Sequence, residues 1–134
     1  MNMKLKRIIV IAGSILLLLL LSSMAFLYFW IGISVKENIK TAKELYPGNA
    51  EDALISLMID ENYSATGRSH TAIWTLGQLK SKKALPLLLE LYKDDPKGKT
   101  CYGKHDSLLC QYEIYKAITA IEKGSLFSYN RFKD

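Results

Sequence analysis

The chain begins with one long apolar segment and continues with shorter segments whose apolar residues recur every three to four positions. Residues 8–33 contain no charged side chain. A helix over these residues would extend about 39 Å at 1.5 Å per residue, which is enough to cross about 30 Å of hydrocarbon. The pattern therefore predicts a transmembrane helix at residues 8–33.

A cleaved signal peptide is the alternative for this segment, because Ser23, Met24 and Ala25 place small residues at the spacing that a signal peptidase requires. The apolar segment continues well past this point, beyond the usual length of a signal's apolar region. Tyr28 and Trp30 near its end are typical of the aromatic belt at a membrane interface. We therefore expect a retained signal anchor with Tyr28 and Trp30 at the interface.

The orientation in the membrane depends on basic residues, which occur on both sides of the segment. Three lie in the tail at residues 1–7, and Lys36, Lys40 and Lys43 follow the segment, so the positive-inside rule separates the two orientations only weakly. A short basic tail before a first apolar helix is the usual start of a signal anchor. We expect a single-pass protein with residues 1–7 in the cytosol and the remaining domain extracytoplasmic; a cytosol-facing adaptor is the open alternative.

The rest of the chain shows helical periodicity and no sustained alternation of apolar and polar residues, which predicts an all-α fold. Residues 34–49 are expected to form a juxtamembrane amphipathic helix and turn. Further helices are expected at residues 50–59, capped by Asn49, at 68–79, at 82–93, capped by Ser81, and at 108–123. The expected buried faces are Val35, Ile39, Ala42 and Leu45; Ala53, Leu54, Leu57 and Met58; Ala72, Ile73, Leu76 and Leu79; Leu85, Leu88, Leu89 and Tyr92; and Ile114, Ala117, Ile118 and Ile121.

Residues 68–94 carry a recognisable motif that consists of Arg68, Ala72, Leu76, Gly77, Ala84, Leu85, Pro86, Leu88 and Asp94. This stretch resembles a HEAT-like repeat of the phycobilisome-lyase type, with partial copies at residues 52–60 and 117–121. Glu113 stands where the last copy should have arginine, and an insertion at residues 97–107 interrupts the usual short connection. The resemblance implies that residues 50–124 form a short stack of antiparallel helix pairs that binds proteins. A minority of relatives attach tetrapyrroles, but no residues here match a site for that chemistry.

Charge gives little support for nucleic-acid binding. The chain has a net charge of +5, but three of its 18 basic residues precede the apolar segment, so the remainder is close to neutral. Nucleic-acid binders need clustered Lys and Arg to neutralise phosphates. We expect no nucleic-acid partner.

The only two cysteines, Cys101 and Cys110, bracket the insertion. A disulfide between them would close a short loop and stabilise the fold by about 2–3 kcal/mol in an oxidising compartment. Two free thiols are one alternative. A metal site is another, with His105 and Asp106 as further ligands, but a structural zinc site needs four ligands at recognised spacings. We expect a disulfide, and neither a metal nor a cofactor.

Signatures of catalysis are missing from the sequence, which lacks a nucleophile elbow, a phosphate loop and a metal-binding histidine pair. His70 is expected on the solvent side of its helix. Aromatic residues gather near the C-terminus, where the tail at residues 125–134 either binds a partner or folds back as a cap. The candidates for partner binding are Trp74, Tyr112, Tyr115, Phe127, Tyr129 and Phe132.

Together these features favour a membrane-anchored, non-enzymatic protein-protein interaction module. An accessory or assembly subunit of a membrane protein complex is the form we expect, with no small-molecule substrate evident. A lyase-like enzyme or chromophore-attachment factor is the alternative from another class, and it would require a cleft with convergent polar residues around His70 or Cys101.

Overall fold

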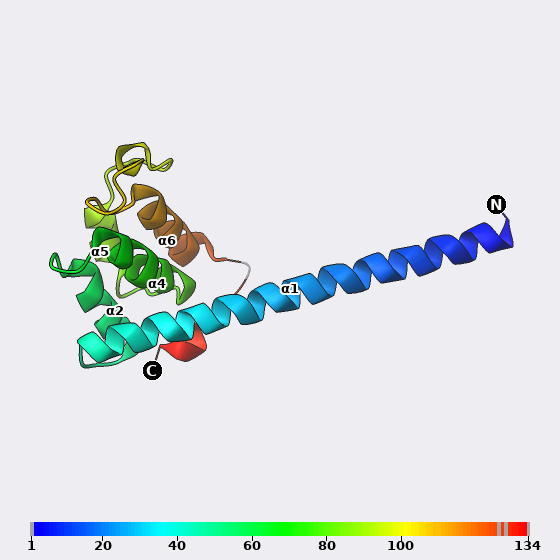
Figure 1. Cartoon of the computed structure of the whole chain (residues 1–134), viewed down its shortest axis with the longest axis horizontal. Helices are drawn as coiled ribbons and strands as arrows, with labels where there is room; N and C mark the ends of the chain where they lie inside the picture. Colours follow the sequence, from blue (N-terminus) through cyan, green and yellow to red (C-terminus); the bar gives the residue numbers. More distant parts are fainter. Residues whose placement is uncertain (1, 126, 128, 134) are drawn as a thin grey trace. The chain divides into compact units, whose positions relative to one another are not determined.

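The computed structural model describes residues 2–125, 127 and 129–133. Helices and loops make up these residues, with no strand among them, so the all-α prediction is confirmed for the part described. The chain divides into two compact units, Met1–Ile33 and Ser34–Asp134. One unbroken helix, α1 (Met3–Leu45), contributes residues to both units (Figure 1).

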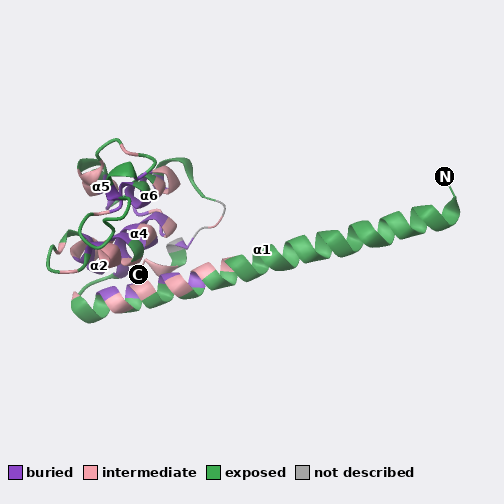
Figure 2. Ribbon diagram, turned by 45° about the horizontal axis from the view of Figure 1, so that its top comes forward, coloured by how far each residue is buried: buried purple, intermediate pink, exposed green. Residues whose placement is uncertain are grey.

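The N-terminal unit is the apolar part of α1. Residues 2–27 are all exposed, and Figure 2 shows this part of α1 as a green ribbon. The hydroxyl groups of Ser14 and Ser23 donate to the carbonyl groups of Val10 and Leu20, at 2.9 and 2.8 Å, so they are satisfied within the helix as a lipid environment requires. Among the described residues, α1 is the one helix long and apolar enough to cross a membrane, and it is compatible with the predicted anchor.

The second unit contains the remaining helices. Its three main α-helices are α2 (Ala50–Ile59), α5 (Leu85–Leu91) and α6 (Gln111–Lys123). A continuous helical run is formed by α3 (Ala65–Gly67), the π-helix η1 (Arg68–Ile73) and α4 (Trp74–Gln78). Two 3₁₀ turns, η2 (Lys99–Cys101) and η3 (Asn130–Phe132), complete the unit.

Helix α2 follows its prediction in full. The side-chain oxygen of Asn49 accepts a hydrogen bond from the Asp52 amide at 2.9 Å, which satisfies one of the free amides of the first turn. The expected apolar faces of α2 and of the helical run through α4 are completely buried, and the expected face of α6 is also buried.

The predicted helix at residues 82–93 is wrong at both ends, since α5 covers only Leu85–Leu91. Pro86 explains the late start, because it has no N–H to bond the carbonyl of Lys82. Ser81 instead caps a single turn, where its carbonyl and hydroxyl oxygens both accept from the Ala84 amide at 3.2 Å. The predicted face is also partly wrong: Leu88 is buried, but Leu89 is 49% exposed.

Two other boundaries differ from the prediction. Helix α6 begins at Gln111 rather than 108, because the Leu108 amide bonds to the Lys104 carbonyl in a separate loop turn. The amphipathic helix predicted after the membrane segment is the end of α1, and it buries Val35, Ile39 and Ala42 as expected. Leu45, assigned to the same face, is exposed at the last position of the helix.

Helices α4 and α6 lie side by side and form the centre of the second unit (Figure 1). Gly77 makes this close approach possible, because a Cβ at this position would lie 2.9 Å from the Cα of Ala117 and 3.1 Å from its Cβ. Helix α5 packs on α6, and α2 packs on η1. The Asn38 amide nitrogen donates to the Thr75 hydroxyl at 2.9 Å and links α1 to α4 within this unit.

Candidate functional site

The six residues proposed for partner binding have different exposures. Tyr112 is 45% exposed and Tyr115 is 37% exposed. Trp74, Phe127 and Phe132 are half-buried, while Tyr129 is fully buried at 0% exposure. A buried aromatic packs within its own domain, so Tyr129 fits the capping interpretation and leaves Tyr112 and Tyr115 as the most accessible candidates.

Tyr112 and Tyr115 belong to a continuous face across α5 and α6, which we call the aromatic face and define as Leu89, Tyr92, Tyr112 and Tyr115. The rings of Tyr92 and Tyr115 are stacked with their centroids 6.1 Å apart, which joins the two helices. Residues three apart on a helix are neighbours on its surface, so Leu89 lies beside Tyr92, and Tyr112 lies beside Tyr115. The Lys116 ammonium lies 4.6 Å from the centroid of the Tyr112 ring. The face thus combines exposed aromatic and aliphatic surface with a cation.

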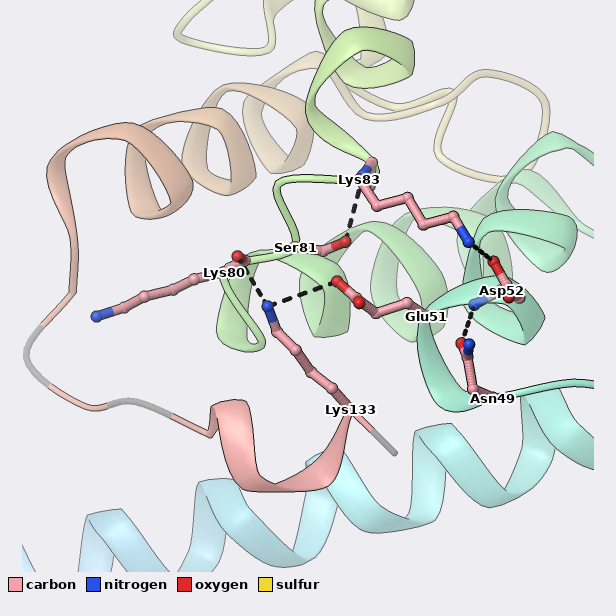
Figure 3. A network of polar contacts seen from close by, with 8 residues as sticks. Asn49, Glu51, Asp52, Lys80, Ser81, Lys83 and Lys133 are labelled. Carbon is pink, nitrogen blue, oxygen red and sulfur yellow. Dashed lines mark hydrogen bonds and ion pairs between the residues drawn. The ribbon is translucent and has the colours of Figure 1, made fainter.

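The C-terminal segment is held against its own domain by polar contacts. The Lys133 ammonium lies 3.5 Å from the Glu51 carboxylate and donates to the Lys80 carbonyl at 3.3 Å (Figure 3). The Lys36 ammonium lies 5.2 Å from the centroid of the Phe132 ring, and that ring stacks on Tyr129 at 6.2 Å. This part of the predicted tail therefore covers the domain. Residues 126, 128 and 134 of the tail lie outside the described residues.

Figure 3 also shows how α2 is tied to the turn before α5. The Lys83 ammonium pairs with the Asp52 carboxylate, close to the Asn49 cap of α2. This ion pair is largely exposed and stabilises the fold little, because exposed pairs contribute about 0–1 kcal/mol.

The loop between α5 and α6 brings Cys101 and Cys110 together. Both are buried, and their sulfur atoms lie 3.0 Å apart, too far for a disulfide bond of about 2.05 Å. One ligand atom of His105 lies within 4.8 Å of both sulfur atoms. Burial is the main cause that raises the pKa of Cys110, followed by its contact with Cys101, while the amides of Glu113 and Tyr112 act in the opposite direction. The predicted disulfide stays a prediction.

Several residues that the sequence reasoning missed hold this loop in place. The buried Ser69 hydroxyl accepts from the Cys110 amide at 3.0 Å. The Thr66 hydroxyl contacts the His105 carbonyl at 2.8 Å and an Asp106 carboxylate oxygen at 2.9 Å. Gly98 has a φ of +61°, and a Cβ there would lie 3.2 Å from the Cys101 sulfur. Of these three residues, only Gly98 could have been noticed in the sequence, because glycine commonly occurs where the backbone is left-handed.

A cavity of about 370 Å³ lies beside this loop. Its lining includes Arg68, Lys93, Thr100, Ser107 and Glu61, but neither His70 nor Cys101. The Arg68 Nε donates to the Met58 carbonyl at 2.8 Å, so the motif arginine connects to the last turn of α2. His70 is exposed. The lyase-like alternative requires a cleft around His70 or Cys101. The cavity described here is lined by neither residue.

Two carboxylates outside the cavity, Asp60 and Glu113, have surroundings that stabilise their negative charge. Hydrogen bonds lower the pKa of Asp60, chiefly the one donated by the Tyr46 hydroxyl, with the Asn62 amide next.

Glu113 is buried in the first turn of α6, where one carboxylate oxygen pairs with the Lys116 ammonium at 2.7 Å. Its other oxygen has no hydrogen-bond partner among the described residues. The amides at a helix N-terminus favour a carboxylate there.

Comparison of the chain with protein-family models, with curated proteins and with solved structures found no match.

Proposed function

We propose that this protein is a single-pass membrane protein whose helical domain binds another protein and performs no catalysis itself. The observation that carries the proposal is the exposure of both apolar surfaces: the apolar part of α1 and the aromatic face on α5 and α6. The first surface fits lipid, and the second fits a protein. An accessory or assembly subunit of a membrane complex needs both.

The membrane assignment is supported by the side chains of α1. A soluble protein exposes apolar residues singly or in patches of a few hundred Å², whereas this helix exposes them over many consecutive turns. The Phe26 and Trp30 rings lie 5.8 Å apart near the end of the apolar segment, where aromatic side chains favour the headgroup region.

The protein-binding assignment is supported by the composition of the aromatic face. Tyrosine is enriched at the energetic centres of protein interfaces, because it contributes a large rigid surface and a hydroxyl group. The stacked Tyr92 and Tyr115 rings limit the motion of the face before binding, which lowers the entropy lost on association.

The HEAT-like interpretation remains part of this proposal. It is supported by the contact between Gly77 and Ala117, which are motif residues of the best repeat and of the following partial copy. It is also supported by the hydrogen bond from Arg68 to the end of α2. Stacked repeats contact their neighbours in this way. A stack this short leaves its last helices accessible to a partner.

Affinity purification of the full chain from gently solubilised membranes tests the proposal. The partner should be recovered with the wild type, and the double variant Tyr112→Ala, Tyr115→Ala should lose about 2 kcal/mol or more of binding free energy, or roughly 30-fold in affinity. The matched control is Tyr102→Ala, since Tyr102 is the more exposed tyrosine and lies outside the aromatic face.

Equal recovery with the double variant and the wild type would reject the aromatic face as the binding surface. Trp74→Ala is a second variant for that case, and it should weaken binding without changing the melting temperature if Trp74 is an anchor. Release of the wild-type chain from membranes by alkaline carbonate would reject the membrane assignment.

A further inference from the structure

The loop between α5 and α6 gathers three side chains that carry metal-ligand atoms. The sulfur atoms of Cys101 and Cys110 and a ring nitrogen of His105 all lie within 4.8 Å of one another. We propose that Cys101, Cys110 and His105 bind a zinc ion when both cysteines are reduced. This site goes beyond the proposed function and does not rest on it.

The distances fit zinc with small side-chain movements. Zinc bonds to thiolate sulfur at about 2.3 Å and to histidine nitrogen at about 2.0–2.1 Å, so ligand atoms around a tetrahedral ion lie roughly 3.3–3.8 Å apart. The sulfur atoms lie 3.0 Å apart, and their separation must increase by less than about 1 Å. The ring nitrogen of His105, which lies within 4.8 Å of the sulfur atoms, must approach them by up to about 1.3 Å. We expect side-chain rotation to supply both shifts.

The first turn of α6 partly offsets the cost of burying a thiolate at Cys110. Cys110 is the N-cap residue of α6, a helix of 13 residues, and the amides of Tyr112 and Glu113 in the first turn act on its thiol. These amides and the helix dipole stabilise a negative charge. Both cysteines are buried while His105 is exposed, so an ion can enter from the histidine side and remain shielded on the sulfur side.

The backbone around the ligands is already fixed. Ser69 holds the Cys110 amide, and Thr66 holds the carbonyl of His105 and the side chain of Asp106. The Cys101 thiol donates to the Gly98 carbonyl at 3.2 Å, and this bond is lost when the metal ion replaces the thiol proton. A site with prearranged ligands loses less conformational entropy when the ion binds.

Three protein ligands leave the fourth position of a tetrahedral ion to water or to a donor atom of a bound molecule, as in catalytic zinc sites. Binding replaces both thiol protons: one Zn²⁺ enters, two Zn–S bonds form and two protons leave to solvent. A disulfide between the same cysteines consumes both ligands, with two electrons passing to an oxidant. The zinc-bound and disulfide forms therefore exclude each other.

Cobalt titration of the full chain in detergent tests the site, after reduction and without oxygen. We expect saturation at one Co²⁺ per chain, with a sulfur-to-cobalt charge-transfer band and the visible bands of a tetrahedral ion. Binding of either Co²⁺ or Zn²⁺ to the free reduced chain should release two protons per ion, and zinc should then displace the cobalt without further proton release. Because the chain has only two cysteines, the charge-transfer band can come only from this site.

Substitutions distinguish the three proposed metal ligands from residues that do not bind the ion. Cys101→Ser or Cys110→Ser should weaken the band strongly, and His105→Ala should lower the cobalt affinity at least about tenfold, since even changes behind the ligands cost 10–100-fold. His70→Ala is the matched control, because His70 is the only other histidine and is also exposed. Circular dichroism confirms that each variant remains folded.

The proposal is overturned if the reduced wild type shows no saturable cobalt band. It is also overturned, as a three-ligand site, if His105→Ala and His70→Ala bind cobalt equally well. Oxidation of the wild type to the disulfide should abolish binding, and full binding by the oxidised chain would equally contradict the assignment.

Discussion

At the scale of single residues, Asp60 gives the domain a dependence on pH. The Tyr46 hydroxyl and the Asn62 amide donate to its carboxylate and stabilise the charged form, which lowers its pKa in the folded state. In the unfolded chain the pKa returns to about 3.9. The stabilisation is therefore complete above that value and is lost as the pH falls through the lower folded-state pKa.

Replacing Asp60 with Asn should flatten this part of the stability profile. Urea unfolding measured from pH 6 down to pH 2 should show a smaller fall in the midpoint for Asp60→Asn than for the wild type. Glu61→Gln, an exposed neighbour, is the matched control and should keep the wild-type slope. Equal slopes in all three proteins would show that the Tyr46 contact has no effect on stability.

Ser69 is the second residue with a clear energetic role. Its hydroxyl is the acceptor for the buried Cys110 amide, and Ser69→Ala would leave that amide without a partner. The expected loss is about 1–3 kcal/mol of the free energy of unfolding, measured by urea denaturation. Ser107→Ala removes an exposed hydroxyl from the same loop region and should change stability by less than about 0.5 kcal/mol.

The contact to Ser69 shows where sequence reasoning stops at this scale. Apolar periodicity located Ala72, Ile73 and Leu76 on a buried face, because burial repeats with the helical period. It could not locate Ser69, a buried polar residue of η1 whose hydroxyl accepts from the Cys110 amide at the end of a distant loop. Cys101 and Cys110 were paired from their isolation in the sequence, whereas the approach of His105 depends on how the insertion folds.

At the scale of the elements, the contact between α4 and α6 limits the size of residue 77. A Cβ there would approach the backbone of Ala117 at 2.9 Å, and overpacking of this kind costs about 1–3 kcal/mol. Alanine recovers up to about 1 kcal/mol through helix propensity. Gly77→Ala should therefore be destabilising by about 1–2 kcal/mol, and Gly77→Val by more.

Thermal unfolding followed by circular dichroism measures this effect. Gly13→Ala is a suitable control, because it makes the same substitution in α1 at a position with open space around it. It should leave the unfolding of the domain unchanged. A stabilising effect of Gly77→Ala would mean that α6 can shift away from α4 at little cost.

The ends of a helix were predictable where a capping residue next to it in the sequence determines them. The Asn49 cap fixed the start of α2, and Gly124, with a φ of +86°, follows the end of α6. The start of α5 was missed because Ser81 looked like a helix cap, although Pro86 removes the amide that the first turn would need. The π-helix η1 had no counterpart in the pattern, since a period of 3.6 does not anticipate a local insertion.

At the scale of the whole molecule, the orientation in the membrane can be measured directly. In a variant without Cys101 and Cys110, single cysteines replace either Lys97 or Asn2, both exposed. The expected orientation places residues 1–7 in the cytosol and the helical domain outside it. It predicts that a membrane-impermeant maleimide labels Lys97→Cys in intact cells and Asn2→Cys only after permeabilisation. The opposite pattern would support the cytosol-facing adaptor.

The same orientation also predicts whether the native cysteines are oxidised or reduced. In an extracytoplasmic domain, mass spectrometry of freshly isolated protein under non-reducing conditions should find the Cys101 and Cys110 peptides linked. Removal of that disulfide should lower the free energy of unfolding by about 2–3 kcal/mol. Free thiols in the isolated protein would remove this support for the topology and would favour the reduced, zinc-binding form.

The contacts around the end of α1 impose an order on the synthesis of the protein. Val35, Ile39 and Ala42 emerge early, but the residues that contact this part of the helix include Thr75 and Phe132, near the middle and the end of the domain sequence. Contacts between such distant residues form late and slow the folding of a chain. The nascent protein therefore carries an exposed apolar stripe next to its membrane segment until the later residues that contact this part of α1 have been synthesised.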